Sequence, residues 1–198
     1  GALWSASEVC VDPREVVARL PQFLQRRFGV QFHFATPATD CEPGHVKAGG
    51  TSWSARRLWI CAGDDLRTLY PELLQAAGLV HCKLQMMRTP PDSTPGRLGP
   101  MLAAGLTLKH YKSFERCPSL PSLKERLVRD MPLHDRHGIH VLVSQNGLGE
   151  LTLGDSHEYG EPVSPFDQQE IDDLVLNYLQ GFLDLPALRV ASRWHGVY

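Results

Sequence analysis

Alternating side chains over residues 80–87 limit the fold of this chain more than any other feature of its sequence. The run reads Val-His-Cys-Lys-Leu-Gln-Met-Met. Successive side chains on a β-strand point to opposite faces, so this alternation predicts a long strand in a sheet. Strand-like runs also occur at 101–111, 139–145 and 150–154. Together these four runs predict an antiparallel sheet.

Helix signals surround this sheet. Asp12-Pro13 followed by Glu15 has the acid, proline and glutamate of a helix start, which predicts a helix over 13–28 that ends at Gly29. A second helix is expected over 120–130. A third is expected to open at Ser164-Pro165, with Ile171, Val175 and Leu179 on its apolar face and Asp172 on its wet face.

The first third of the chain carries strand and turn signals. Alternating phenylalanines over 31–36 predict a strand, and Gly49-Gly50 predicts a tight hairpin turn. Residues 58–61 are apolar on both faces, which is typical of a buried strand. A glycine turn at Gly63 and a helix with leucines from Leu66 to Leu74 are expected to follow.

The pattern as a whole predicts an α+β fold in two parts. Residues 1–79 would form one part, with a helix, short strands and a buried strand, and residues 80–198 a second part with an antiparallel or mixed sheet and flanking helices. The residues at both termini suggest that the chain is part of a longer protein.

Composition narrows the function classes. The formal net charge is −2, and no run of like charges suggests a nucleic-acid or membrane-surface partner. No apolar stretch approaches the roughly 18 residues of a membrane span. The five cysteines are odd in number and widely spaced, which favours reduced thiols packed as small core residues and a cytoplasmic location.

Two polar constellations stand out, and neither predicts chemistry strongly. His134, His137 and His140 are spaced by three, but no Cys-x-x-Cys accompanies them, and we expect no metal site. The run 155–158, Asp-Ser-His-Glu, contains the residue types of a hydrolase triad. Neighbours on an extended chain point to opposite faces, which makes a capped strand end the favoured interpretation.

Several segments resemble the D-amino-acid oxidase-like FAD-dependent oxidoreductases, a superfamily that includes glycine and sarcosine oxidases. The likeness lies in Val-Asp-Pro before a helix, in the apolar run that ends in Ala62-Gly63, and in the long strands that follow. Within the superfamily, the chain is similar to a branch associated with phosphonate catabolism. The motifs that carry this similarity are 82–89 (CKLQMMRT), 105–111 (GLTLKHY), 144–146 (SQN), 154–160 (GDSHEYG) and 193–198 (RWHGVY).

The resemblance implies a substrate-binding fragment of an enzyme that oxidises an amine, amino acid or aminophosphonate. Residues 1–79 would be a partial FAD-binding domain, and residues 80–198 a substrate-binding domain that is truncated where the chain would return to the FAD domain. Hydride transfer to FAD would give an imine and then a carbonyl product. No Gly-x-Gly-x-x-Gly turn is present, so the fragment is expected to hold FAD weakly and to be inactive without the FAD-domain segments missing at its two ends.

The resemblance also assigns candidate residues. Those near FAD are Pro37, Ala62, Gly63 and Trp194, and the candidate proton acceptors are His140, His157 and His195. The candidates for the substrate are Lys83, Arg88, His110, Tyr111, Arg193 and Tyr198. An alternative function is a non-enzymatic module that binds a small anion or a peptide.

Overall fold

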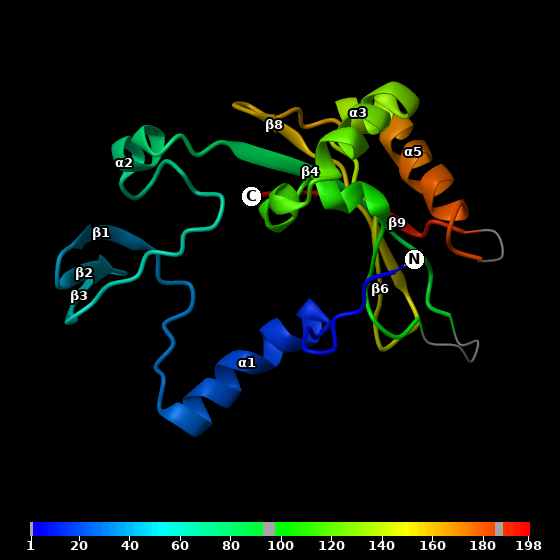
Figure 1. The fold of residues 1–198 in the computed structure, drawn as a ribbon. Coiled ribbons are helices and arrows are strands. Elements are labelled where there is room, and N and C mark those ends of the chain that lie inside the picture. The colour runs from blue at the N-terminus through cyan, green and yellow to red at the C-terminus, as the bar shows by residue number, and fades with distance from the viewer. Residues whose placement is uncertain (1, 93–97, 185–187) are drawn as a thin grey trace. The chain divides into compact units, whose positions relative to one another are not determined.

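The computed structural model describes residues 2–92, 98–184 and 188–198 and divides the chain into two compact units. The larger unit comprises the residues up to Asp12 together with Cys82–Val197, and the smaller comprises Pro13–His81 together with Tyr198. The expected domain boundary lies at 79/80. Both units contain antiparallel strands with helices, so the α+β class is confirmed (Figure 1).

A six-stranded sheet organises the larger unit. The long strand β4 pairs antiparallel with β7 and also with β9, which lies off the main path of the sheet. The strand order along that path is β5-β6-β7-β4-β8. The strands are β4 (His81–Arg88), β5 (Leu102–Ala103), β6 (Leu142–Gln145), β7 (Leu151–Gly154), β8 (Glu158–Gly160) and β9 (Ser192–Val197).

Helices α3 (Leu120–Asp130) and α5 (Gln169–Gln180) supply apolar side chains to one core with this sheet (Figure 1). The short helix α4 (Pro132–Arg136) follows α3. The start and end expected for α3 are confirmed. The core comprises Met87, Ala104, Leu106, Leu127, Ile139, Val141, Val143, Leu151, Leu153, Ile171, Val175 and Leu179.

Helix α5 begins later than predicted. Its first residue is Gln169, because the preceding segment is held in extended form by side chains of β4. Gln168 N–H donates to Gln85 Oε1 at 2.8 Å, and Lys83 Nζ donates to the carbonyl oxygen of Phe166. The prediction that Asp172 lies on the wet face is also wrong, since this residue is only 5% exposed.

The predicted strand over 101–111 is mostly wrong. Only Leu102 and Ala103 pair with β6, and the chain then turns into two 3₁₀ helices, η1 (Gly105–Lys109) and η2 (Lys112–Arg116). Leu106 and Thr107 are both buried, which a half-buried strand would not allow for neighbours. Over so few residues, apolar positions that alternate as in a strand cannot be distinguished from apolar positions that repeat every three residues as in a 3₁₀ helix.

The smaller unit contains helix α1 (Pro13–Phe28), as predicted, and a three-stranded meander. Its strands are β1 (Ala38–Glu42), β2 (His45–Ala48) and β3 (Thr51–Ser54). Gly49 and Gly50 make the predicted turn, with φ of 53° and 77°, which is the conformation that favours glycine. The strand expected over 31–36 is absent, and residues 34 and 35 form a turn.

The buried strand predicted at 58–61 is not formed. Trp59 is 81% exposed and Ile60 is 43% exposed, and no strand of residues 13–81, all of which the structure describes, pairs with them. A strand that is apolar on both faces needs neighbours on both sides. Of the helix expected from Leu66 to Leu74, only the later part forms, as α2 (Pro71–Ala76). Pro71 fixes its first turn, and the backbone of Tyr70 before it is in the left-handed conformation.

The five cysteines are free, but three of them are exposed, so the prediction that most pack in a core is wrong. Cys41 and Cys82 are buried, and Cys10, Cys61 and Cys117 are not. Among the described residues, no helix has the length and apolarity needed to cross a membrane. Residues 89–99 are rich in proline and glycine, which predicts a mobile loop, and part of this segment lies outside the described residues.

Candidate functional site

Three histidine rings and one carboxylate meet inside the larger unit. We call His110, His140, Asp155 and His157 the imidazole–carboxylate cluster. The ring centroid of His110 lies 4.5 Å from that of His140 and 4.8 Å from that of His157. The rings of His140 and His157 are also 4.8 Å apart, and His140 Nε2 lies 2.8 Å from Asp155 Oδ1.

The pairing of β6 with β7 brings the cluster together. His140 lies just before β6, and Asp155 directly follows β7. The two residues exchange backbone hydrogen bonds, His140 N–H to Asp155 O at 3.1 Å and Asp155 N–H to His140 O at 2.9 Å. His157 is two residues further along the extended chain and therefore lies on the same face as Asp155. His110 ends helix η1.

Burial favours the neutral form of two imidazoles of the cluster, those of His110 and His157. It is the main cause that lowers the pKa of His110 from 6.5 to about 4, and the neighbouring His140 and His157 lower it further. Burial also lowers the pKa of His157, although its hydrogen bond to Gly138 acts in the opposite direction. A neutral imidazole offers one nitrogen lone pair, which can accept a proton or bind a metal ion.

The cluster contains buried polar atoms without hydrogen bonds. His110 Nε2, His140 Nδ1 and Asp155 Oδ1 have no hydrogen-bond partner among the described residues. Asp155 Oδ1 is 2.8 Å from His140 Nε2, yet this contact does not have hydrogen-bond geometry. Such orphaned groups are rare in folded proteins because each costs about 1–3 kcal/mol, so they point to a ligand at this position.

The triad-like run 155–158 is split between two faces. Ser156 turns toward β4, where its Oγ accepts the Gln85 N–H at 3.1 Å. Asp155 and His157 turn toward His140. Glu158 is bonded elsewhere, since its Oε1 accepts the N–H of Ser164. Ser156 is therefore not activated by His157.

Two aromatic side chains flank the cluster. The ring of Tyr111 meets that of His140 edge-on, with centroids 6.2 Å apart, and Tyr111 is 48% exposed. Tyr159 lies beside His157 at 6.0 Å, and burial raises the pKa of its phenol. Four of the residues that the resemblance assigns to catalysis or substrate thus lie together: His110, Tyr111, His140 and His157.

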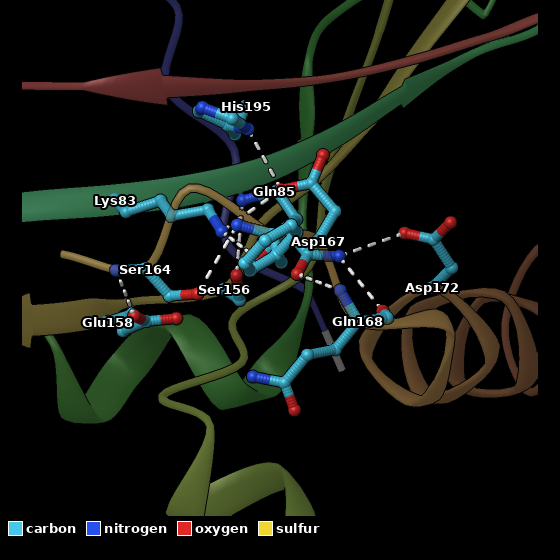
Figure 2. Close-up of polar contacts among 10 residues, drawn as sticks. Lys83, Gln85, Ser156, Glu158, Ser164, Asp167, Gln168, Asp172 and His195 are labelled. Carbon is cyan, nitrogen blue, oxygen red and sulfur yellow. Dashed lines mark hydrogen bonds and ion pairs between the residues drawn. The ribbon is translucent and has the colours of Figure 1, made fainter.

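Three other predicted residues belong to a second polar group, and Figure 2 shows two of them, Lys83 and His195. The buried Lys83 Nζ lies 3.0 Å from Asp167 Oδ1, and His195 Nδ1 lies 2.8 Å from the same oxygen. Arg193 Nε donates to Asp172 Oδ2 at 2.7 Å. Lys83 and Arg193 are already neutralised by carboxylates, and together with His195 they hold the segment before α5 and the helix itself to β4 and β9.

Gln85 completes this second group. Its Nε2 donates to Gln168 O at 3.0 Å and to Asp172 Oδ1 at 3.3 Å (Figure 2). We call Lys83, Gln85, Asp167, Gln168, Asp172, Arg193 and His195 the Asp167 network. Its contacts fix the backbone rather than converge on an open site.

Arg88 also faces a carboxylate, because its Nε lies 3.7 Å from Glu150 Oε1. The guanidinium sits 5.9 Å from the ring centroid of Trp194, which is 38% exposed. Lys83 and Arg88 are therefore not free cations that wait for an anionic head group. Trp194 was predicted to lie near FAD, and here it stacks with Arg88 on neighbouring strands.

The remaining predicted FAD contacts lie in the smaller unit. Pro37, Ala62 and Gly63 are exposed. Gly63 has a φ of +64°, and no atom lies within 4 Å of the position that a Cβ would occupy. A ligand could therefore approach this backbone closely. Tyr198, expected to bind substrate, is 60% exposed at the end of the chain.

The three regularly spaced histidines separate in space. His134 lies beside Tyr178 of α5, with centroids 5.9 Å apart, and His137 Nε2 lies 3.1 Å from Glu170 Oε2. Only His140 reaches the cluster. The cluster member that the sequence analysis missed is Asp155, and the available signal was its spacing of two from His157 in an extended segment.

No family model, no curated protein and no solved structure matches this chain.

Proposed function

We propose that this chain is the substrate-binding part of an FAD-dependent oxidoreductase that oxidises an amine. One observation carries the proposal: His110, His140 and His157 lie within ring-contact distance of one another, and the ring of Tyr111 contacts that of His140. They come from three separate segments of the chain, and the resemblance assigns each of them to substrate or to proton transfer.

The cluster suits an amine substrate for two reasons. Burial favours the neutral form of His110 and His157, which in that form do not repel a protonated amine, and the Asp155 carboxylate attracts one. Neutral imidazoles can also take a proton from the substrate nitrogen. Of the histidines predicted to do so, His140 and His157 lie in the cluster, whereas His195 is held by Asp167.

FAD, when bound, would accept the hydride from the carbon that carries the amine. The residues present fit only one edge of such a cofactor. Gly63 offers an open backbone with positive φ, but the glycine-rich phosphate turn is absent from the sequence. Trp59 and Ile60 expose an apolar segment that further strands of a cofactor domain would cover. We therefore propose that segments outside this chain provide the rest of the FAD site.

A chain that includes the proposed cofactor segments tests this function directly. The protein is purified from the full reading frame and its visible spectrum is recorded. It is then mixed without oxygen with simple amines, amino acids and aminophosphonates. Bound flavin that is bleached by a member of this panel supports the proposal. A colourless protein that does not bind added FAD contradicts it.

An aminophosphonate is the substrate that we propose within this class. The expected cations Lys83, Arg88 and Arg193 are engaged by carboxylates, which leaves His110 and Tyr111 as the polar groups for its head group. Comparing an aminophosphonate with the matched amine that lacks the phosphonate measures this preference. Equal rates of flavin reduction would limit the proposal to the amine alone.

A further inference from the structure

We propose that His140, Asp155 and His157 form a binding site for a divalent transition-metal ion such as zinc or iron(II). The inference goes beyond the proposed function and does not depend on flavin. A metal ion would occupy the imidazole lone pairs that could otherwise accept the substrate proton, so the ion and a protonated amine would be alternative occupants of the cluster. It concerns side chains that the larger unit holds by itself.

The ligand atoms are close enough to share one ion. One donor atom from each of the three residues lies within 4.8 Å of the other two. Bonds of about 2.0–2.2 Å to zinc place such donors about 3.3 Å apart, so modest side-chain rotation would complete the site. All three side chains are well buried, with 7%, 11% and 8% of their surface exposed for His140, Asp155 and His157.

Unpartnered buried atoms are the second observation. His140 Nδ1 and Asp155 Oδ1 have no hydrogen-bond partner among the described residues. A surface cluster of acids would be solvated, but these atoms are shielded from water and still make no hydrogen bond to the described residues. A bound cation would satisfy the carboxylate oxygen and a nitrogen lone pair together.

His157 is already oriented as a ligand. Its Nδ1 lies 2.9 Å from Gly138 O. A carbonyl oxygen only accepts, so Nδ1 carries the proton and the lone pair of the neutral ring is on Nε2. Metal-binding histidines usually donate their other ring N–H to such an oxygen, which fixes the ring.

The donor set indicates the class of metal. Two imidazoles and one carboxylate suit zinc, iron(II) and cobalt(II), whereas calcium and magnesium prefer oxygen ligands throughout. Three protein ligands leave a coordination position for water or for an oxygen of an anionic ligand. His110 Nε2, buried and unpartnered, is next to this position and can hydrogen-bond to the group bound there.

Cobalt(II) titration of the 198-residue chain tests the site. The protein is first treated with a chelator and then titrated with cobalt(II), whose visible absorption reports imidazole and carboxylate coordination. We expect one ion per chain, displaced by zinc. His140→Ala, Asp155→Asn and His157→Ala should each weaken binding by at least about 10-fold. Wild-type protein that binds no cobalt or zinc would overturn the proposal.

Matched controls remove histidines outside the site. His134→Asn and His137→Asn should leave the dissociation constant unchanged, since these residues contact α5 instead. Loss of binding in these two variants with retention in His140→Ala would also overturn the site. Asp155→Asn preserves side-chain volume, and circular dichroism shows whether each variant is folded. Because the titration needs no flavin, its result is independent of the amine oxidation test.

Discussion

The buried ammonium of Lys83 lies 3.0 Å from the carboxylate of Asp167, at the point where the chain approaches α5. Lys83 is only 1% exposed, whereas the Asp167 side chain is 38% exposed. The amine also donates to the carbonyl oxygen of Phe166. This pair explains why the helix starts at Gln169, because the segment before it is tied to a strand.

Asp167→Asn should lower the free energy of unfolding by about 2 kcal/mol. The change leaves a buried cation without its carboxylate, and the partial exposure of Asp167 makes the loss smaller than the roughly 3–5 kcal/mol of a fully buried pair. Urea unfolding followed by circular dichroism measures it. Asp173→Asn, on the exposed face of α5, is the control and should change stability by less than about 0.5 kcal/mol.

The double variant Lys83→Met/Asp167→Asn should recover part of this loss. An unbranched apolar side chain replaces the cation that would otherwise be buried alone. Lys83→Met is measured alone for comparison. If the double variant loses as much free energy of unfolding as the two single variants lose together, the two side chains are not coupled.

Stability should fall as the pH drops from about 6.5 to about 4, and His110 should contribute to this fall. Burial and the nearby His140 and His157 lower the pKa of His110 to about 4, whereas the unfolded chain titrates near 6.5. The unfolded state binds more protons in this window, so its population rises as the pH decreases. Above about 6.5 the contribution is complete and constant.

The measurement compares wild-type protein and His110→Gln by urea unfolding across this pH range, with a chelator present. The variant should show a weaker dependence, although His134 and His157, whose pKa values are also lowered by burial, still contribute. Identical pH profiles would show that His110 is not held in its neutral form by burial.

Gly138→Ala should destabilise the protein by about 3 kcal/mol and move His157. Gly138 has a φ of +55°, and a Cβ there would lie 2.9 Å from His157 Cβ and 3.0 Å from its carbonyl oxygen. Left-handed backbone alone costs an alanine about 1–2 kcal/mol, and the steric clash adds to that.

Gly99→Ala is the matched control for this change. Gly99 has a φ of +79°, but no atom lies within 4 Å of its Cβ position, so only the backbone cost of about 1 kcal/mol remains. Equal losses in the two variants would mean that contact with His157 contributes nothing.

Leu179→Ala should destabilise the larger unit by about 2–5 kcal/mol. Leu179 is fully buried in the core, and its truncation would leave a cavity between α5 and the sheet. Leu148→Ala removes the same atoms from a residue that is 61% exposed and should have little effect. Similar changes for both variants would contradict the assignment of this core.

Local signals in the sequence predicted the elements that local chemistry determines. Helix α1 follows from Pro13 and Glu15, and the β2–β3 turn follows from Gly49-Gly50. The late start of α5 was not predictable in this way, because its cause is Lys83, which lies more than 80 residues earlier in the chain.

The candidate site was only partly predictable for the same reason. The resemblance named His140 and His157, but their meeting with Asp155 depends on the pairing of β6 with β7. The spacing of three grouped His140 with His134 and His137. In the structure both of these residues lie apart from His140, in contact with α5. The pairing between strands decides which side chains converge, and the spacing of residues along the sequence does not reveal that pairing.

Anaerobic flavin reduction by amines is the measurement that tests the central claim most directly. It uses protein from the full reading frame, with His140→Ala as the test variant and His134→Asn as the control. The account predicts that an amine or aminophosphonate bleaches the wild-type and control flavin, and that reduction in His140→Ala is at least about 100-fold slower. Flavin that no amine reduces, or equal rates in all three proteins, would contradict the assignment of this cluster to substrate oxidation.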